Sequence, residues 1–233
     1  MIRLKKTQSI AWGMLLSVTA AAAALAASVA QADPNPTVPA PSLSPGYKVE
    51  WVEVSGPPGA PAPSAPHSIA NAVDILSGGG GFTIVNSSTQ YLDYIDLSDA
   101  SVPFAGADPV FAIRVSGYIS LPSAGSYSFL TFHDDGIRVR VGGETVVSFD
   151  ADTPGIFTDS AFFNLPAGVY EYEAISWEQG GVFSLGLGID IDGPNNDTGR
   201  FFLAGNHVPE PGSLALLGVA LAGLGFYRRR ELC

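Results

Sequence analysis

The sequence contains a single cysteine, Cys233, which is also its last residue. A disulfide within one chain and a metal site built from cysteines are therefore both excluded. Basic residues are scarce as well, because 11 Lys and Arg stand against 22 Asp and Glu, for a net charge of -11. Binding to phosphates needs a basic surface, so this charge balance argues against nucleic acid as a partner.

Short catalytic motifs are also missing. The sequence has no G-x-S-x-G elbow, no phosphate-binding loop and no H-E-x-x-H pair. Glycoside hydrolysis uses two carboxylates about 5 to 10 Å apart across a cleft, which adjacent aspartates such as Asp134 and Asp135 do not obviously supply. We therefore expect a protein that is not an enzyme.

The amino terminus has the three parts of a secretory signal. Basic residues within the first six positions precede an apolar stretch over residues 10–29, and Ala30-Gln31-Ala32 follows as a small-x-small cleavage site. This order predicts a signal helix within a signal peptide over residues 1–32, with a mature chain that begins near Asp33. An uncleaved N-terminal anchor is the alternative.

The carboxyl terminus also carries three parts in a fixed order. It begins with a short motif, continues with the uncharged residues 213–227 and ends in a basic cluster; the motif and the cluster consist of Pro209, Glu210, Pro211, Arg228, Arg229 and Arg230. The uncharged stretch is shorter than the ~20 residues that span a bilayer comfortably, and flanking arginines stay on the cytoplasmic side. The pattern predicts a C-terminal transmembrane sorting helix.

This arrangement resembles the PEP-CTERM sorting signal of Gram-negative bacteria over residues 208–233. The resemblance implies recognition by an exosortase, a membrane protease-transpeptidase, with cleavage near the Pro-Glu-Pro motif. It further implies export through the inner membrane and a final place at the cell surface or in an extracellular matrix linked to exopolysaccharide and biofilm. A simple C-terminal membrane anchor is the alternative.

The stretch between the two signals is strongly acidic. Five basic and 20 acidic residues lie between Asp33 and Val208, which leaves a net charge of -15. Such a surface keeps an exported domain soluble and repels anionic surfaces unless cations intervene. Residues 33–45 are rich in Pro, Ala, Ser and Thr and predict an extended linker, and residues 46–205 are expected to form one domain.

Alternation of apolar and polar residues predicts short β-strands in this domain. The clearest run covers residues 110–121, and further runs cover residues 49–54, 126–132, 137–141, 145–149, 169–177 and 182–191. Strands of this length separated by Gly- and Pro-containing turns predict an all-β fold, an antiparallel β-sandwich or jelly-roll-like barrel. Only residues 69–76, between Ser68 and the glycine run 78–81, predict a helix.

Several short motifs follow one another in a recognisable order. Ser116-Gly117-Tyr118-Ile119 precedes a Pro-x-x-Gly turn, and then come Tyr127-Ser128-Phe129, Asp134-Asp135-Gly136 and Leu165-x-Ala167-Gly168-x-Tyr170. This order resembles the protective-antigen fourteen-kilodalton-type domain, a β-sandwich shared by bacterial toxins, yeast flocculins and some glycosidases. The resemblance covers roughly residues 46–191.

In the carbohydrate-binding members of that family, paired aspartates hold a calcium ion that contacts sugar hydroxyls. Asp134 and Asp135 match that pair, so the resemblance implies Ca²⁺ as a cofactor and a glycan as the ligand. Hard Ca²⁺ takes six to eight oxygen ligands, and adjacent carboxylates on a turn can supply some of them. The family adds an asparagine and backbone carbonyls from a later loop, whereas the equivalent turn here, residues 178–181, is short and has no asparagine.

Other interpretations of these residues remain open. One aspartate of the pair can instead cap its own turn by accepting backbone N–H groups. His133 is a candidate transition-metal ligand, but a lone histidine at a strand end is more typical of an ordinary surface residue. Most aromatic residues fall in expected strands and are expected in the core, while Tyr118, opposite the hydrophobic set, is a candidate ligand-binding residue.

Together these features predict an exported surface or matrix protein with a non-catalytic carbohydrate-binding or adhesion module. Its expected partners are the exosortase, the secretion machinery, a polysaccharide or other matrix component and, before processing, the membrane. The alternative is a structural matrix or surface component with no discrete ligand.

Overall fold

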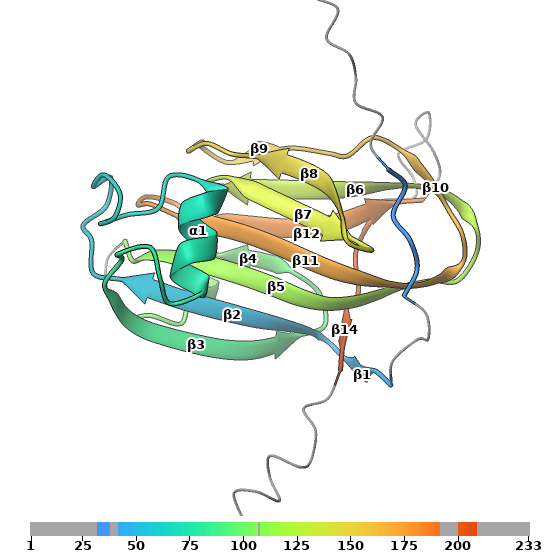
Figure 1. Ribbon diagram of the computed structural model, residues 1–233, viewed down its shortest axis with the longest axis horizontal. Coiled ribbons are helices and arrows are strands. Elements are labelled where there is room, and N and C mark those ends of the chain that lie inside the picture. Colours follow the sequence, from blue (N-terminus) through green and yellow to red (C-terminus); the bar gives the residue numbers. More distant parts are fainter. Residues whose placement is uncertain (1–31, 38–41, 107, 192–199, 209–233) are drawn as a thin grey trace, which may run out of the picture. The chain divides into compact units, whose positions relative to one another are not determined.

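The computed structural model describes residues 32–37, 42–106, 108–191 and 200–208 (Figure 1). The chain divides into two units, Met1–Ala30 and Gln31–Cys233, and all described residues belong to the second. The expected signal helix and the expected sorting helix lie outside the described residues. In the part of the chain that the structure describes, no helix is long and apolar enough to cross a membrane.

Two antiparallel sheets form a β-sandwich, as the alternation predicted. The first sheet contains β1 (Ser44–Pro45), β2 (Tyr47–Val54), β3 (Ile84–Leu92), β5 (Val110–Leu121), β7 (Ile137–Val141), β8 (Glu144–Phe149), β11 (Gly168–Glu178) and β14 (Asn206–His207). The second contains β4 (Asp96–Ser98), β6 (Gly125–Asp134), β9 (Ile156–Phe157), β10 (Phe163–Leu165), β12 (Ser184–Asp190) and β13 (Arg200–Phe202). A short 3-10 helix, Asp99–Ser101, follows β4.

The main hydrophobic core lies between the two sheets and takes alternate residues from each strand. Trp51 of β2 contacts Phe111 of β5 and Phe183, with ring centroids 5.3 and 5.7 Å apart. All three side chains are buried, and burying one such side chain contributes about 1.5–3 kcal/mol. The long antiparallel pairing of β5 with β11 joins residues 111–121 to residues 168–178 and forms the centre of the first sheet.

The one α-helix within the described ranges, α1 (Ile69–Leu76), covers part of the outer face of the first sheet (Figure 1). The Ser68 hydroxyl caps it by accepting the Asn71 N–H at 3.2 Å, and the helix ends before the glycine run. The bounds are those that the sequence predicted. Its buried side chains pack in a second cluster with Val110, Ala112 and Trp177, which explains why β5 has apolar residues on both faces near its start.

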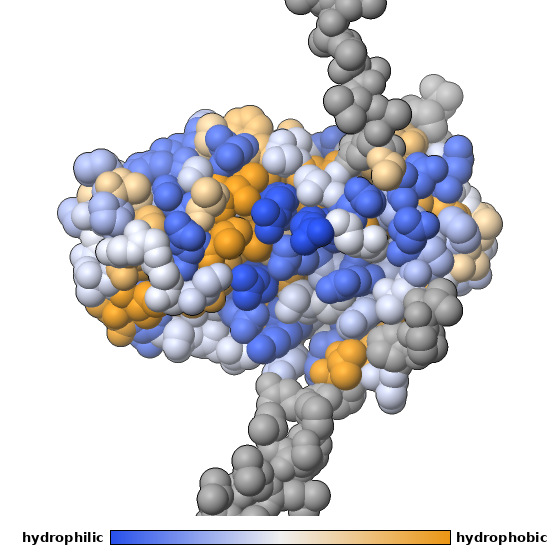
Figure 2. Space-filling model, in the orientation of Figure 1, coloured by the Kyte–Doolittle hydropathy of each residue, from blue (hydrophilic) through white to orange (hydrophobic). Residues whose placement is uncertain are grey.

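Charged side chains occupy the outer face of the first sheet beside α1, and Figure 2 shows hydrophilic residues gathered there. Glu50 binds Lys48 at 3.0 Å and Arg114 at 3.8 Å. Glu173 in turn binds Arg114 at 3.6 Å and Arg138 at 3.2 Å. Isolated surface ion pairs contribute little, but these five side chains form one network across four strands, β2, β5, β7 and β11.

The described part of the expected linker contacts the domain. The Thr37 N–H donates to the Val169 carbonyl at 2.6 Å, and Pro34 is buried. β1 then pairs with β14, so that residues from the beginning and the end of the domain lie side by side at the edge of the first sheet.

Candidate functional site

Three acidic side chains meet where β6 and β11 end. Asp134 is the last residue of β6, Asp135 follows it in the turn to β7, and Glu178 is the last residue of β11. One carboxylate oxygen from each residue lies within 4.8 Å of the other two. The peptide bond between Asp134 and Asp135 is cis, and the Asp135 N–H donates to the Trp177 carbonyl at 3.0 Å.

Asp135 is 2% exposed and ties three segments together. Its two carboxylate oxygens accept the backbone N–H groups of Thr153 and Gln179, each at 3.0 Å. Both donors lie outside the turn that contains Asp135, so these two bonds do not cap that turn. Each oxygen keeps a further lone pair that is available to a cation.

Glu178 is the side chain that the sequence did not identify as a candidate ligand. It is 2% exposed, and its Oε1 accepts the Gly180 N–H at 2.6 Å. Its Oε2 is buried and finds no hydrogen-bond donor among the described residues. A buried carboxylate oxygen without a partner is costly, so this atom marks a place that a cation would satisfy.

The pKa values of all three carboxyl groups are raised. Burial is the largest cause in each case, and the neighbouring carboxylates add to it. The pKa of Asp135 rises to about 6 and that of Glu178 to about 8. Carboxylates that disfavour ionisation when alone become good ligands once a positive charge lies between them, and oxygen-only donors suit hard Ca²⁺.

A cavity of about 230 Å³ lies beside Glu178. Asp99 contributes a further carboxylate to its wall, and Phe111 and Phe183 contribute aromatic surface. The Asp99 Oδ1 accepts the Phe183 N–H at 2.8 Å, which fixes the carboxylate near the site. The acidic cluster therefore adjoins a space in which a ligand group can reach a bound cation.

His133 is fully buried, so the expectation of a surface residue is wrong. Its Nδ1 contacts the Asp135 carbonyl at 2.5 Å and its Nε2 contacts the Thr158 hydroxyl at 2.9 Å. Burial lowers its pKa, which favours the neutral ring. Both ring nitrogens have partners, and His133 contacts the turn through the Asp135 carbonyl. It is not part of the acidic cluster.

Tyr118 lies far from the paired aspartates. In the β5–β11 pairing, Phe111 is opposite Glu178 and Tyr118 is opposite Glu171. Tyr118 is seven residues from Phe111, and at about 3.3 Å per residue it lies about 23 Å along the strand from the position opposite Glu178. The structure thus brings together Asp134 and Asp135 but not Tyr118, whose role in ligand binding stays a separate prediction.

His67 lies outside the acidic cluster and connects the segment at Ala60 with the segment at Asp152. His67 Nε2 contacts the Ala60 carbonyl at 2.7 Å and its Nδ1 contacts the Asp152 carboxylate at 2.6 Å. Both partners only accept, so the two contacts together favour the ring with a hydrogen on each nitrogen, which is the charged form. Burial lowers the pKa of His67, but these two bonds and the charges of Asp152 and Asp135 outweigh it and leave the pKa raised.

We expect the His67→Ala variant to lose about 1 kcal/mol of folding free energy at pH 6 and clearly less at pH 9. A histidine with a raised pKa stabilises the fold below its unfolded value of 6.5, and this contribution is lost as the pH rises through the folded value. Chemical denaturation of parent and variant at both pH values measures it. An equal difference at the two pH values would contradict the charged contact.

Two models of known families match this sequence, one within the β-sandwich and one at the carboxyl terminus. Residues 76–170 match the model of the PA14 domain, so the chain carries a β-sandwich domain of the kind that the motif order predicted. Residues 207–230 match the PEP-CTERM protein-sorting motif. This motif implies exosortase processing and export across the inner membrane to the surface of a Gram-negative cell. A search of curated proteins found no match.

Solved structures show the same architecture. The PA14 domain of the antifreeze protein MpAFP is 20% identical with a TM-score of 0.56, and the match covers 78% of this chain and 98% of that one. The PA14 sugar-binding domain of an RTX adhesin is 18% identical with a TM-score of 0.54, over 70% and 98% of the two chains. An epithelial adhesin A domain from Candida glabrata, in complex with Galβ1-4GlcNAc, is 15% identical with a TM-score of 0.54, over 78% and 99%. At these identities the likeness establishes the fold alone.

Proposed function

We propose that this protein is a surface or matrix adhesin whose acidic site binds Ca²⁺ and, through it, the hydroxyl groups of a glycan. The observation that carries the proposal is the buried, unpartnered Oε2 of Glu178, which lies with Asp134 and Asp135 in one group of carboxylates. Three oxygen ligands within 4.8 Å of one another match Ca–O distances of about 2.3–2.6 Å around one ion.

The asparagine that the family uses is replaced here by a carboxylate. Glu178 stands at the start of the short Glu-Gln-Gly-Gly turn and offers a charged oxygen in place of a neutral one. A bound Ca²⁺ would supply an electrophilic centre with open positions for sugar oxygens. Asp134, Asp135 and Glu178 would hold it, while Thr153 and Gln179 orient Asp135 through their N–H groups.

The role that we propose is binding without catalysis. Sugar-binding adhesin domains share the fold, and the sorting motif supports delivery to the outside of the cell, where polysaccharide is the available partner. We further propose that exosortase cleaves near Pro209-Glu210-Pro211 after the signal peptide has been removed. The structural matrix role without a discrete ligand is the alternative that the following test separates.

A glycan array probed with the full chain in detergent, once with calcium and once with a chelator, tests the proposal. We expect binding that is lost on chelation and lost in the Asp134→Asn variant. The Glu144→Gln variant, which removes one charge from β8 in the first sheet, is the matched control and is expected to bind normally. Absence of binding under both conditions would overturn the proposal in favour of the structural matrix role.

A further inference from the structure

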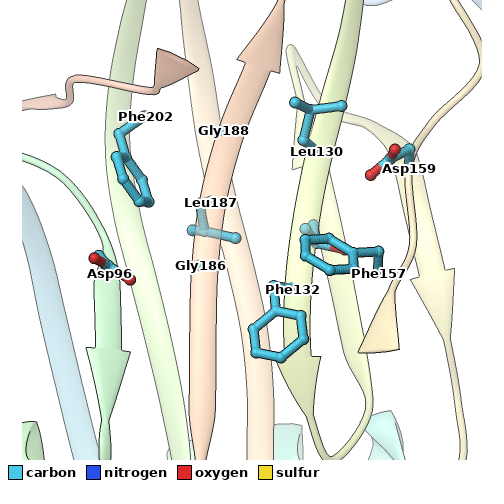
Figure 3. A pocket seen from close by; sticks show the side chains of 10 residues that line it. Asp96, Leu130, Phe132, Phe157, Asp159, Gly186, Leu187, Gly188 and Phe202 are labelled. Carbon is cyan, nitrogen blue, oxygen red and sulfur yellow. The ribbon is translucent and has the colours of Figure 1, made fainter. Parts of the chain in front are cut away.

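The outer face of the second sheet carries an open groove of about 740 Å³, which shares no residue with the cavity beside Glu178. Its floor is formed by Gly186 and Gly188 of β12, whose inward neighbour Leu187 is buried in the core. Figure 3 shows side chains rising on both sides of this strand. Because glycine has no side chain, the floor is bare backbone that a flat ligand can approach closely.

Residues opposite one another on four strands form the first row across the groove. Gly186 pairs with Asp96 of β4 on one side and with Phe132 of β6 on the other. Phe132 pairs in turn with Phe157 of β9, and their ring centroids are 4.7 Å apart. The row thus has a carboxylate at one end and an aromatic ring at the other.

The second row has the opposite order. Gly188 pairs with Phe202 of β13 on the side of Asp96 and with Leu130 of β6 on the other. Asp159 lies beyond Leu130. Its chain neighbours Thr158 and Ser160 donate their N–H groups to the carbonyls of Thr131 and Phe129, the two chain neighbours of Leu130. The two rows are one two-residue step of β12 apart, about 6.6 Å.

Each end of the groove therefore has one aromatic ring and one carboxylate side by side. Asp96 and Phe202 form one end, and Phe157 and Asp159 form the other (Figure 3). Phe157 is 76% exposed and Phe202 is 55% exposed, although both are large apolar side chains. Three strand spacings of about 4.8 Å separate the ends, a span of about 14 Å. The same pair of groups, repeated at this distance, fits a ligand that itself repeats.

The charged residues that line the groove, Asp96 and Asp159, are both acidic. Lys48, Arg114, Arg138 and Arg140 belong to strands of the first sheet, whereas Arg200 is the first residue of β13 in the second sheet and pairs with Asp190 of β12. The region from Asp33 to Val208 has a net charge of -15. A cationic ligand is therefore attracted to this groove, while an anionic polysaccharide or a second copy of this acidic chain is repelled.

We propose that this groove binds a cationic amino-sugar chain, such as β-linked glucosamine, independently of calcium. The apolar C–H face of a sugar ring lies on Phe157 or Phe202, and the ammonium group of the same or the next ring lies beside Asp159 or Asp96. Aromatic rings also attract ammonium groups directly. An extended lysine-rich peptide fits less well, because the backbone groups of β12 are already paired with β6 on one edge and with β4 and β13 on the other.

The test is calorimetric titration of the full chain, in polyoxyethylene detergent with a chelator, with a β1,4-linked glucosamine tetramer. At about pH 6 the amines are protonated, and we expect binding that the chelator and the Glu178→Gln variant leave unchanged. We expect the Phe157→Ala and Asp96→Asn/Asp159→Asn variants each to weaken binding about tenfold or more. The fully N-acetylated tetramer, which has no charge, is expected to bind about tenfold more weakly.

The control is the Glu144→Gln/Glu171→Gln variant, which removes the same two charges from the first sheet. We expect it to change the affinity less than about twofold. An equal loss in both double variants would show attraction by bulk charge only and overturn the proposal. So would tighter binding of a lysine-rich peptide, self-association abolished by Phe157→Ala, or no binding of the tetramer. Because the chelator is present throughout, failure here is distinct from failure of the calcium site.

Discussion

With calcium removed at about pH 8.5, the Glu178→Gln variant is expected to melt about 5–10 °C above the parent protein, and in excess calcium this order is expected to reverse. The two halves of this expectation have one cause. Glu178 is a buried carboxyl group with a pKa of about 8 against an ordinary 4.5, and it lies against two further carboxylates.

The sign without metal follows from proton binding. Between pH 4.5 and 8 the unfolded chain releases the Glu178 proton while the folded protein retains it, so the free energy of unfolding falls as the pH rises. The expected loss is on the order of 3 kcal/mol. A glutamine keeps the acceptor for the Gly180 N–H, has no charge to bury, and its amide N–H₂ donates to the neighbouring aspartates.

The sign with calcium is the opposite. A ligand that binds only the folded protein at a thousand times its dissociation constant stabilises it by about 4 kcal/mol. The parent protein gains this, whereas the variant has lost one charged ligand and gains little. Because Ca²⁺ competes with protons for these groups, we also expect the calcium-induced rise in melting temperature to be smaller at pH 5.5 than at pH 8.5.

Differential scanning calorimetry of the full chain in detergent measures the melting temperatures of the parent and of Glu178→Gln, each with and without calcium. The matched control is Glu171→Gln on the same strand, β11, where the side chain is exposed and outside the cluster; it is expected to move neither melting temperature by more than about 1 °C. A lower melting temperature of Glu178→Gln without calcium would show that the carboxylate stabilises the empty fold. Equal stabilisation of parent and variant by calcium would place the ion elsewhere.

Much of the fold followed from alternation because most strands bury one face. Strands β5, β7 and β11 were predicted to within one residue, and α1 was predicted with its bounds, since Ser68 and the glycine run mark its ends. The strand β3 was not predicted. Among the described strands it pairs only with β2, and neither of its faces is buried, so its sequence carries no apolar period.

The paired aspartates were found because they are adjacent in the sequence. Glu178 follows them by 43 residues, and only the pairing of β11 with β5 and β7 brings it near. A signal was nevertheless present, because Glu178 has the same strand phase as the buried Tyr170, Tyr172 and Ala174. A carboxylate at an apolar position of a strand indicates either a costly burial or a bound cation.

The alternation along β6 also accounts for the burial of His133. Phe129, Thr131 and His133 are successive inward positions of β6, so burial followed from extending the alternation to the end of the strand. The exposed rings of Phe157 and Phe202 had no such signal. They lie on very short strands, and only the pairing of β9 and β13 with the second sheet places them on one face.

A large loss of stability from a one-methyl change is expected at Gly136, in the turn after the paired aspartates. A Cβ built there would lie 2.2 Å from Trp177 Cη2 and 2.6 Å from the Phe149 carbonyl oxygen. The backbone φ of Gly136 is not positive, so the whole effect comes from these contacts. We expect Gly136→Ala to lower the free energy of unfolding by about 3–5 kcal/mol.

A strand glycine with room around it is the control. At Gly186 the nearest atom to a built Cβ is Phe132 Cβ at 3.6 Å, an ordinary contact. We expect Gly186→Ala to change the free energy of unfolding by less than about 1 kcal/mol, because the alanine also reduces the entropy of the unfolded chain. Denaturant titration of both variants in the presence of a chelator compares them without any contribution from calcium.

The Gly136→Ala substitution is also expected to impair the acidic site in molecules that remain folded. Trp177 accepts the Asp135 N–H through its carbonyl and contacts Asp152 Oδ1 through Nε1 at 3.2 Å, so displacement of its ring moves both sides of the site. We expect calcium to stabilise Gly136→Ala at least about 1 kcal/mol less than it stabilises the parent, and Gly186→Ala as much as the parent. Full calcium stabilisation of Gly136→Ala, alongside its lower stability, would show that the position of Trp177 does not set the geometry of the carboxylates.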